Sequence, residues 1–311
     1  MYDSIVIFGA TATGKTKIAI ELARKLKTEI INADSMYIYK DLNIGTAKPS
    51  REEMSGIKHH LIDHISSEND YNVINFRSDA KKTLILFNNN KLLPIIVGGT
   101  GFYINSLITN YSYGNDSHSE SLRHELLSDL NKYGKEYLYN KLKEIDPEVA
   151  STLHVNDTSR IIRAIEIKLI TGNSKNMIIN NKSPLLTKPL LIGLNTPREE
   201  LYKKINIRVD QMLKAGLINE VSELYSRGLT PENSQSMRGI GYKEIVDYLR
   251  GNCTLEIAID KIKQHTRNYA KRQITWFKRY NDAIWFDTLN DKDIVNKIIK
   301  IYNKDTIDSN N

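Results

Sequence analysis

The chain has 311 residues, of which 40% are apolar. This is enough for one large α/β domain with an insertion, or for two domains, and it excludes a disordered or fibrous chain. Cys253 is the only cysteine, which excludes a disulfide framework and a four-cysteine zinc site. Lys and Arg outnumber Asp and Glu by 44 to 37, and the net charge of +7 permits a polyanionic partner without requiring one.

The sequence shows no signal for secretion or for a membrane. Its first predicted strand begins a few residues after Met1, which leaves no room for a cleavable apolar leader. A run of about 18 apolar residues, as a membrane span requires, occurs nowhere in it. Together with the single cysteine, these features predict a cytoplasmic protein with no membrane partner.

The first region, residues 1–112, alternates apolar runs with helical patterns. The runs at 5–8, 29–32 and 93–97 predict buried parallel strands, and helical spacing of apolar residues predicts helices near 15–26 and 73–88. This alternation is typical of a doubly wound α/β core.

The second region, residues 113–186, shows helical patterns only. Helices are expected to begin near Ser121, Gly134, Pro147 and Asp157. Asp146 has the side chain of an N-cap, and Pro147 then occupies the first helical position. We interpret this region as an all-helical insertion.

The third region, residues 187–311, resumes the core. Strands are predicted at 188–194 and 283–286. Helices are predicted near 197–213, 217–227, 241–250 and 254–280, with one more at the end. The two outer regions therefore form one domain, 1–112 with 187–311.

A phosphate-binding pattern follows the first predicted strand. The pattern G-x-x-x-x-G-K-[ST] is formed by Gly9, Ala10, Thr11, Ala12, Thr13, Gly14, Lys15 and Thr16. Between a strand and a helix N-terminus, its backbone N–H groups, the helix dipole and Lys15 suit a di- or triphosphate, and the Thr16 hydroxyl suits Mg²⁺. A plain glycine-rich turn is the alternative. The sequence thus predicts a P-loop NTPase-like α/β fold with a parallel sheet, helices on both faces and a helical insertion.

Asp34 is the nearest acidic candidate for this site. An ATPase motor or GTPase would place an Asp after the third strand, but Gly98-Gly99-Thr100 stands there. Asp34 follows the second strand, at the edge where open α/β sheets bind ligands. It could be a general base, a cap of the next turn, or a water-bridged magnesium ligand. Thr100 could donate to a phosphate oxygen or simply form a turn.

A basic and aromatic segment covers residues 261–280, which contain seven basic side chains and no acidic one. Lys263, Arg267 and Lys271 share one predicted helix face, and Arg272, Trp276 and Tyr280 share another. Such a helix suits nucleic acid. The alternative is a solvated face with Trp276 and Phe277 in the core. Arg160 and Arg163, in the insertion, could add a second clamp on a nucleic-acid backbone.

The histidines His59, His60 and His64 stand close together, but no further metal ligands accompany them in the sequence. We therefore expect them to be structural.

Several further motifs run in order along almost the whole chain: Gly9–Thr16, Ile31–Tyr37, Asn43–Pro49, His60–Asp63, Val97–Tyr103, Asn156–Glu166, Gly239–Tyr242 and Lys271–Trp276. Together they resemble the tRNA dimethylallyltransferase family, and Ile44–Pro49 and Lys271–Trp276 are highly specific to it. The resemblance implies transfer of a dimethylallyl group from dimethylallyl diphosphate to N6 of the adenosine immediately 3′ of the anticodon, in tRNAs reading codons that begin with U.

The resemblance also implies roles for individual residues. Asp34 takes the N6 proton, while Lys15, Thr16, Thr100 and Arg208 hold the departing diphosphate. The stretches that contact the tRNA anticodon stem–loop correspond to Asp34, Ser35, Met36, Tyr37, Thr100, Arg123, Thr158, Ser159, Arg160, Ile161, Ile162, Arg163, Arg238, Gly239, Lys271, Arg272, Gln273, Trp276 and Lys278. Arg123 lies in the insertion, which matches the family least well.

The departures from the family pattern are small. Ala10 replaces the usual Pro and Thr13 the usual Ser or Val, which leaves the backbone cradle unchanged. The single cysteine rules out the zinc finger of some members, and the family suggests a monomer.

Three other functions stay open at this point. An adenylate isopentenyltransferase would prenylate free AMP or ATP, a P-loop small-molecule kinase would transfer the γ-phosphate of ATP, and a binding module would not need Asp34.

Overall fold

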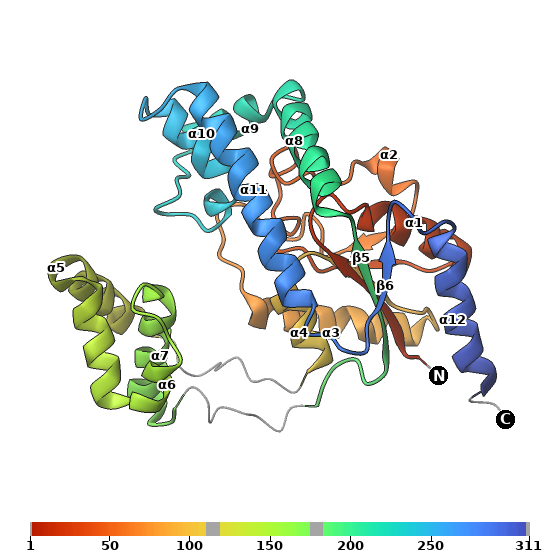
Figure 1. Cartoon of the computed structure of the whole chain (residues 1–311), viewed down its shortest axis with the longest axis horizontal. Helices are drawn as coiled ribbons and strands as arrows, with labels where there is room; N and C mark the ends of the chain where they lie inside the picture. The colour runs from red at the N-terminus through yellow and green to blue at the C-terminus, as the bar shows by residue number, and fades with distance from the viewer. Residues whose placement is uncertain (1, 110–118, 175–182, 309–311) are drawn as a thin grey trace. The chain divides into compact units, whose positions relative to one another are not determined.

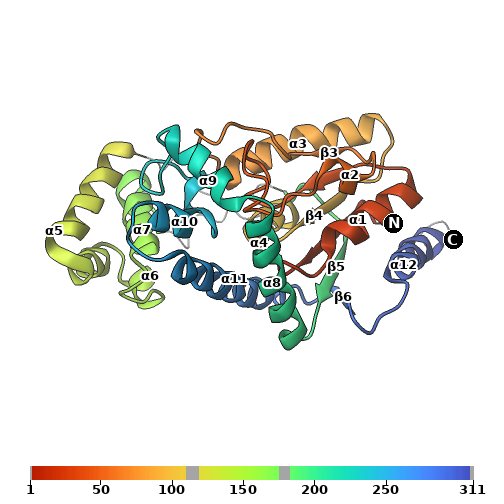
Figure 2. The ribbon, with the colours of Figure 1, turned by 90° about the horizontal axis from the view of Figure 1, so that it is seen from above.

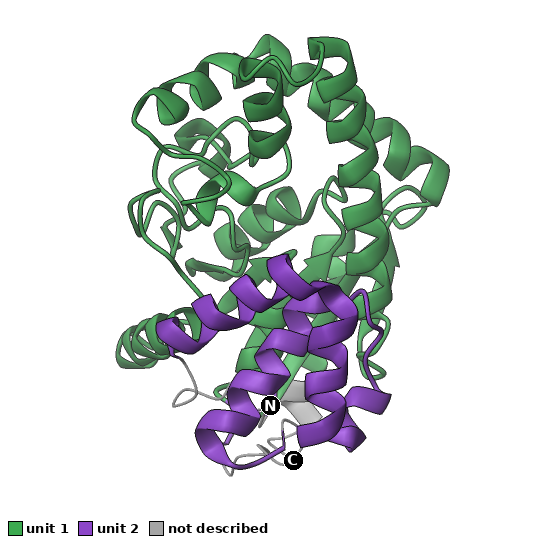
Figure 3. Cartoon of the chain, turned by 90° about the vertical axis from the view of Figure 1, so that its left-hand side faces the viewer, with its two compact units in different colours: residues 1–108, 185–311 green, residues 109–184 purple. Residues whose placement is uncertain are grey.

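The computed structural model describes residues 2–109, 119–174 and 183–308. Contacts within the chain define two compact units, residues 1–108 with 185–311 (unit 1) and residues 109–184 (unit 2) (Figure 3). The expected boundary between residues 112 and 113 lies outside the described residues.

Unit 1 is built on a six-stranded parallel sheet of order β3-β2-β4-β1-β5-β6. The strands are β1 Ser4–Gly9, β2 Ile30–Asn32, β3 His59–His60, β4 Ile95–Gly98, β5 Pro189–Asn195 and β6 Ile284–Asp287. The sequence predicted all of them except β3, whose two residues are too few to give a periodic signal. Because β2, β4 and β1 are neighbours, the loops that follow them meet at one edge of the sheet.

Helices cover both faces of this sheet. Ile5 and Ile7 of β1 pack in one cluster with α1 (Lys15–Leu26) and α12 (Ile294–Asp308), which Figures 1 and 2 show side by side. Phe8 points to the other face, because side chains alternate along a strand, and its ring stacks on Phe277 of α11 (Leu255–Phe277) at 4.8 Å. The predicted α/β fold with helices on both faces is confirmed.

The other helices of unit 1 extend this arrangement. They are α2 Arg51–Met54, α3 Val73–Asn89, α4 Gly101–Ile108, α8 Arg198–Lys214, α9 Leu217–Ser226 and α10 Tyr242–Leu249, with a 3₁₀ turn at Ser236–Arg238. The sequence analysis missed the short α2 and α4. None of the helices in the described ranges of the chain has the length and apolar character that a bilayer span needs.

Unit 2 is helical in its described part: α5 Glu120–Ile145, α6 Pro147–Ser151 and α7 Thr158–Thr171. α5 is broken at Gly134 (φ 83°, ψ 178°), where the sequence predicted a new helix. Asp146 caps α6 by accepting from the Val149 N–H, as predicted. Leu126, Leu138 and Ile165 are fully buried in the core that joins these helices.

Candidate active site

The loop after β1 has the backbone that an anion cradle needs. Gly9 is buried so tightly that a side chain there would overlap the Leu194 carbonyl of β5. Ala12 (φ 64°) and Gly14 (φ 83°) both adopt the left-handed conformation, which turns the chain into α1. No side chain caps α1, so its first N–H groups are available to an anion.

Two cations stand at this loop. The Lys15 ammonium donates to the Ala10 carbonyl at 2.7 Å, and Arg208 of α8 donates to the Thr11 hydroxyl at 3.3 Å. Burial lowers the pKa of Lys15 to about 8, with the nearby Arg208 acting in the same direction and Asp34 opposing it. Lys15 and Arg208 lie close enough for their positive charges to repel each other.

Asp34 follows the end of β2 and lies within reach of the charges of both cations. Asn32 fixes its backbone by accepting from the Asp34 N–H and donating to the Asp34 carbonyl, both at 3.0 Å. One carboxylate oxygen accepts from the Met36 N–H at 3.0 Å, so Asp34 does cap the next turn. Burial raises the pKa of Asp34 above its ordinary value, against the opposing effect of its hydrogen bonds and of Lys15 and Arg208. A cap is thus part of its role, and its predicted role as a general base stays a prediction.

Thr100 joins the end of β4 to the turn after Asp34. Its hydroxyl accepts from the Ser35 N–H at 2.9 Å and lies 3.2 Å from the Ser35 hydroxyl. Thr100 therefore holds the turn that follows Asp34. Its contact with a phosphate oxygen stays a prediction.

A cavity of about 1030 Å³ within unit 1 brings Lys15, Asp34 and Arg208 together, and Thr100 is not among the residues that line it. The phosphate loop and Asp34 line it. The apolar face Ile205, Val209 and Met212 of α8, together with Arg208 and Tyr269, lines it as well. Its wall thus offers cations, a carboxylate and an apolar surface to a single ligand or pair of ligands.

Comparisons with known proteins agree on one family. The IPP transferase family model matches residues 37–280. Proteins named tRNA dimethylallyltransferase are 45% identical in Alkaliphilus metalliredigens, with 95% of this chain and 96% of the relative covered. The tRNA dimethylallyltransferase of Clostridioides difficile is also 45% identical, with 97% of this chain and 98% of the relative covered. The chain belongs to the IPP transferase family.

Solved structures of family members have the same fold. A full-length tRNA isopentenylpyrophosphate transferase from Bacillus halodurans is 42% identical with a TM-score of 0.72, covering 98% of this chain and 96% of its own. A eukaryotic dimethylallyltransferase acting on tRNA is 32% identical with a TM-score of 0.79. The match covers 93% of this chain and 74% of the eukaryotic chain. The predicted resemblance to the tRNA dimethylallyltransferases is therefore confirmed.

The stretches that the sequence predicted to contact tRNA are only partly at the surface of this IPP transferase. Lys271, Arg272 and Lys278 of the α11 region are exposed. Gln273, by contrast, is buried. It accepts from the Thr11 N–H at 2.9 Å and donates to the Gly99 carbonyl at 2.8 Å. The Gln273 side chain therefore joins the phosphate loop to the end of β4 and is not available to tRNA.

Two other basic side chains of this helix have partners within unit 1. Lys263 pairs with Asp210 at 2.6 Å, and Arg267 donates to Asn206 at 2.8 Å. Of the predicted face, only Lys271 is exposed. Trp276 packs against Gly101, where any side chain would overlap the indole ring. Phe277 is buried and Trp276 is half-buried, so packing holds these two side chains, as the second interpretation of the segment expected.

Near the cavity, Ser35, Met36 and Tyr37 line the wall beside Asp34, and Arg238 and Gly239 line it from the 3₁₀ turn. Arg238 also donates to the Pro231 carbonyl at 2.9 Å. These five residues therefore lie on the cavity wall, and their predicted contact with tRNA stays a prediction.

In unit 2 the predicted contacts divide by exposure. Ile161 and Ile162 are buried in the core, so their side chains cannot reach a ligand. Arg123 and Arg163 both pair with Glu166, which is 0% exposed, at 3.2 and 3.3 Å. Arg160 has 68% of its side chain exposed, and Thr158 and Ser159 lie at the start of the same helix. The surface-accessible candidates are therefore concentrated at the N-terminus of α7.

Arg123→Ala is expected to weaken unit 2 because it leaves the buried Glu166 carboxylate short of a partner. The free energy of unfolding of unit 2 should fall by about 1 kcal/mol. This is the low end of the usual cost of leaving a buried polar group without its partner, because the Arg123 side chain is 41% exposed. Hydrogen exchange of the amides in α5 and α7 measures it locally. Arg160→Ala is the control. Equal exchange in the two variants would contradict a structural role for Arg123.

The three histidines have separate partners. His60 contacts Glu29 at 2.5 Å and His64 contacts Asp79 at 3.1 Å, which fits a structural role for both. His59 contacts the Ile57 carbonyl at 2.8 Å and lines the cavity, so its structural role stays a prediction. The described part of the chain holds no cluster of three metal-ligating side chains.

Sequence reasoning missed two residues of the site. Asn32 orients Asp34, and Tyr269 lines the cavity from α11, four residues before Gln273. No sequence pattern marks either residue. Their roles follow only from the folded structure, in which β2, β4 and α11 lie close together.

Proposed function

We propose that this IPP transferase moves a dimethylallyl group from dimethylallyl diphosphate to N6 of the adenosine 3′-adjacent to the anticodon, in tRNAs that read codons beginning with U. Relatives named tRNA dimethylallyltransferase support the reaction. The observation that carries the proposal is that a carboxylate, Asp34, lines one cavity with the cations Lys15 and Arg208 and interacts with both of their charges. That pairing suits a reaction that needs a base for one substrate and anion binding for the other.

The donor diphosphate would lie on the phosphate loop. Its charge would be held by the N–H groups of Gly9–Thr16, by Lys15 and by Arg208. The apolar face of α8 offers a surface to the dimethylallyl group. The loop would therefore bind a prenyl diphosphate rather than ATP.

Magnesium fits this site through Thr16. Its hydroxyl lines the cavity next to Lys15, and a hard cation takes such an oxygen together with waters and phosphate oxygens. When bound, Mg²⁺ would help to neutralise the leaving diphosphate. Every other step is carried by side chains of the chain itself.

The chemistry is a substitution at the first carbon of the dimethylallyl group. A C–N bond forms to N6, the C–O bond to diphosphate breaks, and the N6 proton passes to Asp34. The exocyclic amine is a poor nucleophile, because its lone pair is delocalised into the ring, so a base is useful; such help is worth about 10²–10⁴ in rate. Lys15 and Arg208 stabilise the charge that develops on diphosphate.

The acceptor is proposed to be the anticodon stem–loop, with the adenosine turned out of its stack into the cavity. Exposed Lys271, Arg272 and Lys278 would contact its phosphates. Since the phosphate loop, Asp34 and Arg208 all come from one chain, a monomer suffices, and a tRNA substrate fits a cytoplasmic enzyme.

Changing Lys271 and Arg272 together to Ala should weaken binding of all substrate tRNAs alike. Loss of two phosphate contacts should reduce the slope of log affinity against log salt concentration by roughly 1–2. Affinity for dimethylallyl diphosphate should barely change.

The matched control removes two exposed lysines outside α11, Lys292→Ala with Lys300→Ala. This control has the same net charge as the Lys271, Arg272 variant, but its salt slope should equal that of the wild type. An unchanged slope in the Lys271, Arg272 variant would make these residues part of a solvated face.

One assay separates the proposal from its alternatives. The protein is incubated with labelled dimethylallyl diphosphate and either bulk tRNA or AMP, and separately with γ-labelled ATP. Label on tRNA alone supports the proposal. Label on AMP indicates an adenylate isopentenyltransferase, transfer of γ-phosphate indicates a kinase, and no transfer leaves a binding module.

A further inference from the structure

Glu220 of α9 holds a stretch of backbone far from it in sequence. Its two carboxylate oxygens accept from the N–H groups of Asn43, Ile44 and Gly45 at 2.9, 2.7 and 2.9 Å. The Tyr242 hydroxyl donates to the same carboxylate at 2.7 Å. Four donors thus meet one carboxylate, and bonds to a charged acceptor are stronger than those to a neutral one.

The held backbone continues into the wall of the cavity. Gly45, Thr46, Ala47 and Pro49 line it. Gly45 lies directly under the Tyr242 ring, where a side chain would overlap the ring. Residues 43–45 are therefore held by the Glu220 carboxylate and packed at Gly45 against the Tyr242 ring, and these two side chains are hydrogen-bonded to each other.

A hydrogen bond links this wall to the turn that carries Asp34. The Tyr37 hydroxyl donates to the Ala47 carbonyl at 2.9 Å. Tyr37 belongs to the turn that Asp34 caps through the Met36 N–H. The phosphate loop has separate supports, since Gln273 and Arg208 hold Thr11. A shift of residues 43–47 should thus reach Asp34 and leave the diphosphate site in place.

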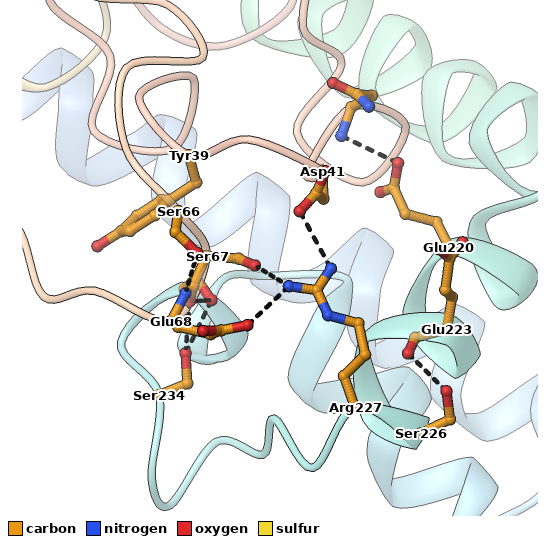
Figure 4. A network of polar contacts seen from close by, with 12 residues as sticks. Tyr39, Asp41, Ser66, Ser67, Glu68, Glu220, Glu223, Ser226, Arg227 and Ser234 are labelled. Atoms are coloured by element: carbon orange, nitrogen blue, oxygen red, sulfur yellow. Dashed lines mark hydrogen bonds and ion pairs between the residues drawn. The ribbon is translucent and has the colours of Figure 1, made fainter.

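α9 makes a second attachment to the same region at its C-terminal end (Figure 4). Arg227 donates to Asp41 at 3.1 Å, to Glu68 at 3.0 Å and to the Ser67 hydroxyl at 3.4 Å. Glu220 and Arg227 are two helical turns apart, so both ends of α9 hold the segment that follows Asp34. The Arg227 ion pairs are largely exposed and contribute less than the carboxylate of Glu220.

We propose that Glu220 is a positioning residue for prenyl transfer. By holding the backbone of residues 43–45, it fixes the cavity wall that orients the acceptor base against Asp34. This inference rests on the proposed function, because it assigns the wall to the acceptor.

The test compares Glu220→Gln with Glu223→Gln, the same change at an exposed position one turn along α9. A Gln amide keeps one acceptor oxygen and presents N–H to the remaining donors. Misplacement of a reacting group by about 1 Å can cost 10²-fold, so kcat/KM for tRNA should fall about 10–100-fold in Glu220→Gln. The Kd for dimethylallyl diphosphate should stay within about twofold, and Glu223→Gln should match the wild type.

Tyr242→Phe is the second variant, because it removes one donor and leaves the carboxylate and the ring in place. It should lower kcat/KM for tRNA in the same direction by a smaller factor, and it carries the test if Glu220→Gln does not fold, as judged by circular dichroism. Wild-type rates in Tyr242→Phe would then overturn the inference.

The outcomes separate the two proposals. If the wild type transfers no label to tRNA, the proposed function fails. If the wild type is active and Glu220→Gln equals Glu223→Gln, the positioning role fails alone. An equal loss of donor binding and of tRNA turnover would also overturn it, since Glu220 would then support the whole cavity.

Discussion

Replacing Asp34 by Asn is expected to lower the turnover of prenyl transfer by at least about 10²-fold while tRNA affinity changes little. The amide is nearly isosteric and can still accept from the Met36 N–H through its carbonyl oxygen, so the turn should persist. It cannot take the N6 proton. Single-turnover rates at saturating tRNA and dimethylallyl diphosphate measure the change directly.

The pH profile of the wild type gives an independent check on Asp34. Burial raises the pKa of its carboxyl group, so the base form is lost at a higher pH than for an ordinary Asp. The transfer rate should therefore fall as the pH drops through that raised pKa, and this acid limb should disappear in Asp34→Asn. Turnover of the variant within a few-fold of wild type would reduce Asp34 to a cap.

Lys15→Ala is expected to act on the donor. Loss of the ammonium should lower kcat/KM for dimethylallyl diphosphate by about 10²-fold or more, because a buried cation next to the phosphates stabilises the leaving group. Affinity for tRNA should not change. Lys81→Ala, which removes an exposed lysine of α3, is the control and should match the wild type.

The lowered pKa of Lys15 makes a further prediction for the wild type. Its value of about 8 means that the free enzyme holds the ammonium below pH 8 and loses it above. Donor affinity should therefore decline as pH rises above about 8, and Lys15→Ala should lack this decline. If prenyl transfer is untouched in Lys15→Ala, the loop is not the donor site and ATP becomes the better candidate ligand.

The parts of the site that the sequence predicted are those made by contiguous residues. The phosphate loop, with its glycines, Lys15 and the start of α1, is a local structure, so its pattern specifies its shape. Asp34 and Thr100 followed from a topological rule, because the ends of neighbouring parallel strands share an edge of the sheet. β3 was missed because its two residues depend on pairing with β2 rather than on their own pattern.

The features of the site that could not be predicted from the sequence depend on contacts between segments that are distant along the chain. Gln273 is a polar residue of a kind that usually lies at the surface. Here it is buried, and its amide forms hydrogen bonds with the backbone of Thr11 and Gly99. Lys263 and Arg267 share a helix face with Lys271, but the packing of α8 against α11 gives them partners. A family's contact stretch thus contains both side chains that can meet a ligand and side chains that hold the fold.

The most direct test of the account is transfer of labelled dimethylallyl groups to a defined anticodon stem–loop RNA. One RNA carries adenosine immediately 3′ of the anticodon, and its partner carries inosine, which lacks the N6 amino group, at the same position. The account predicts label in the adenosine RNA, recovered after nuclease digestion on that nucleoside alone, and none in the inosine RNA. Comparable labelling of both RNAs, or of free AMP, would contradict it.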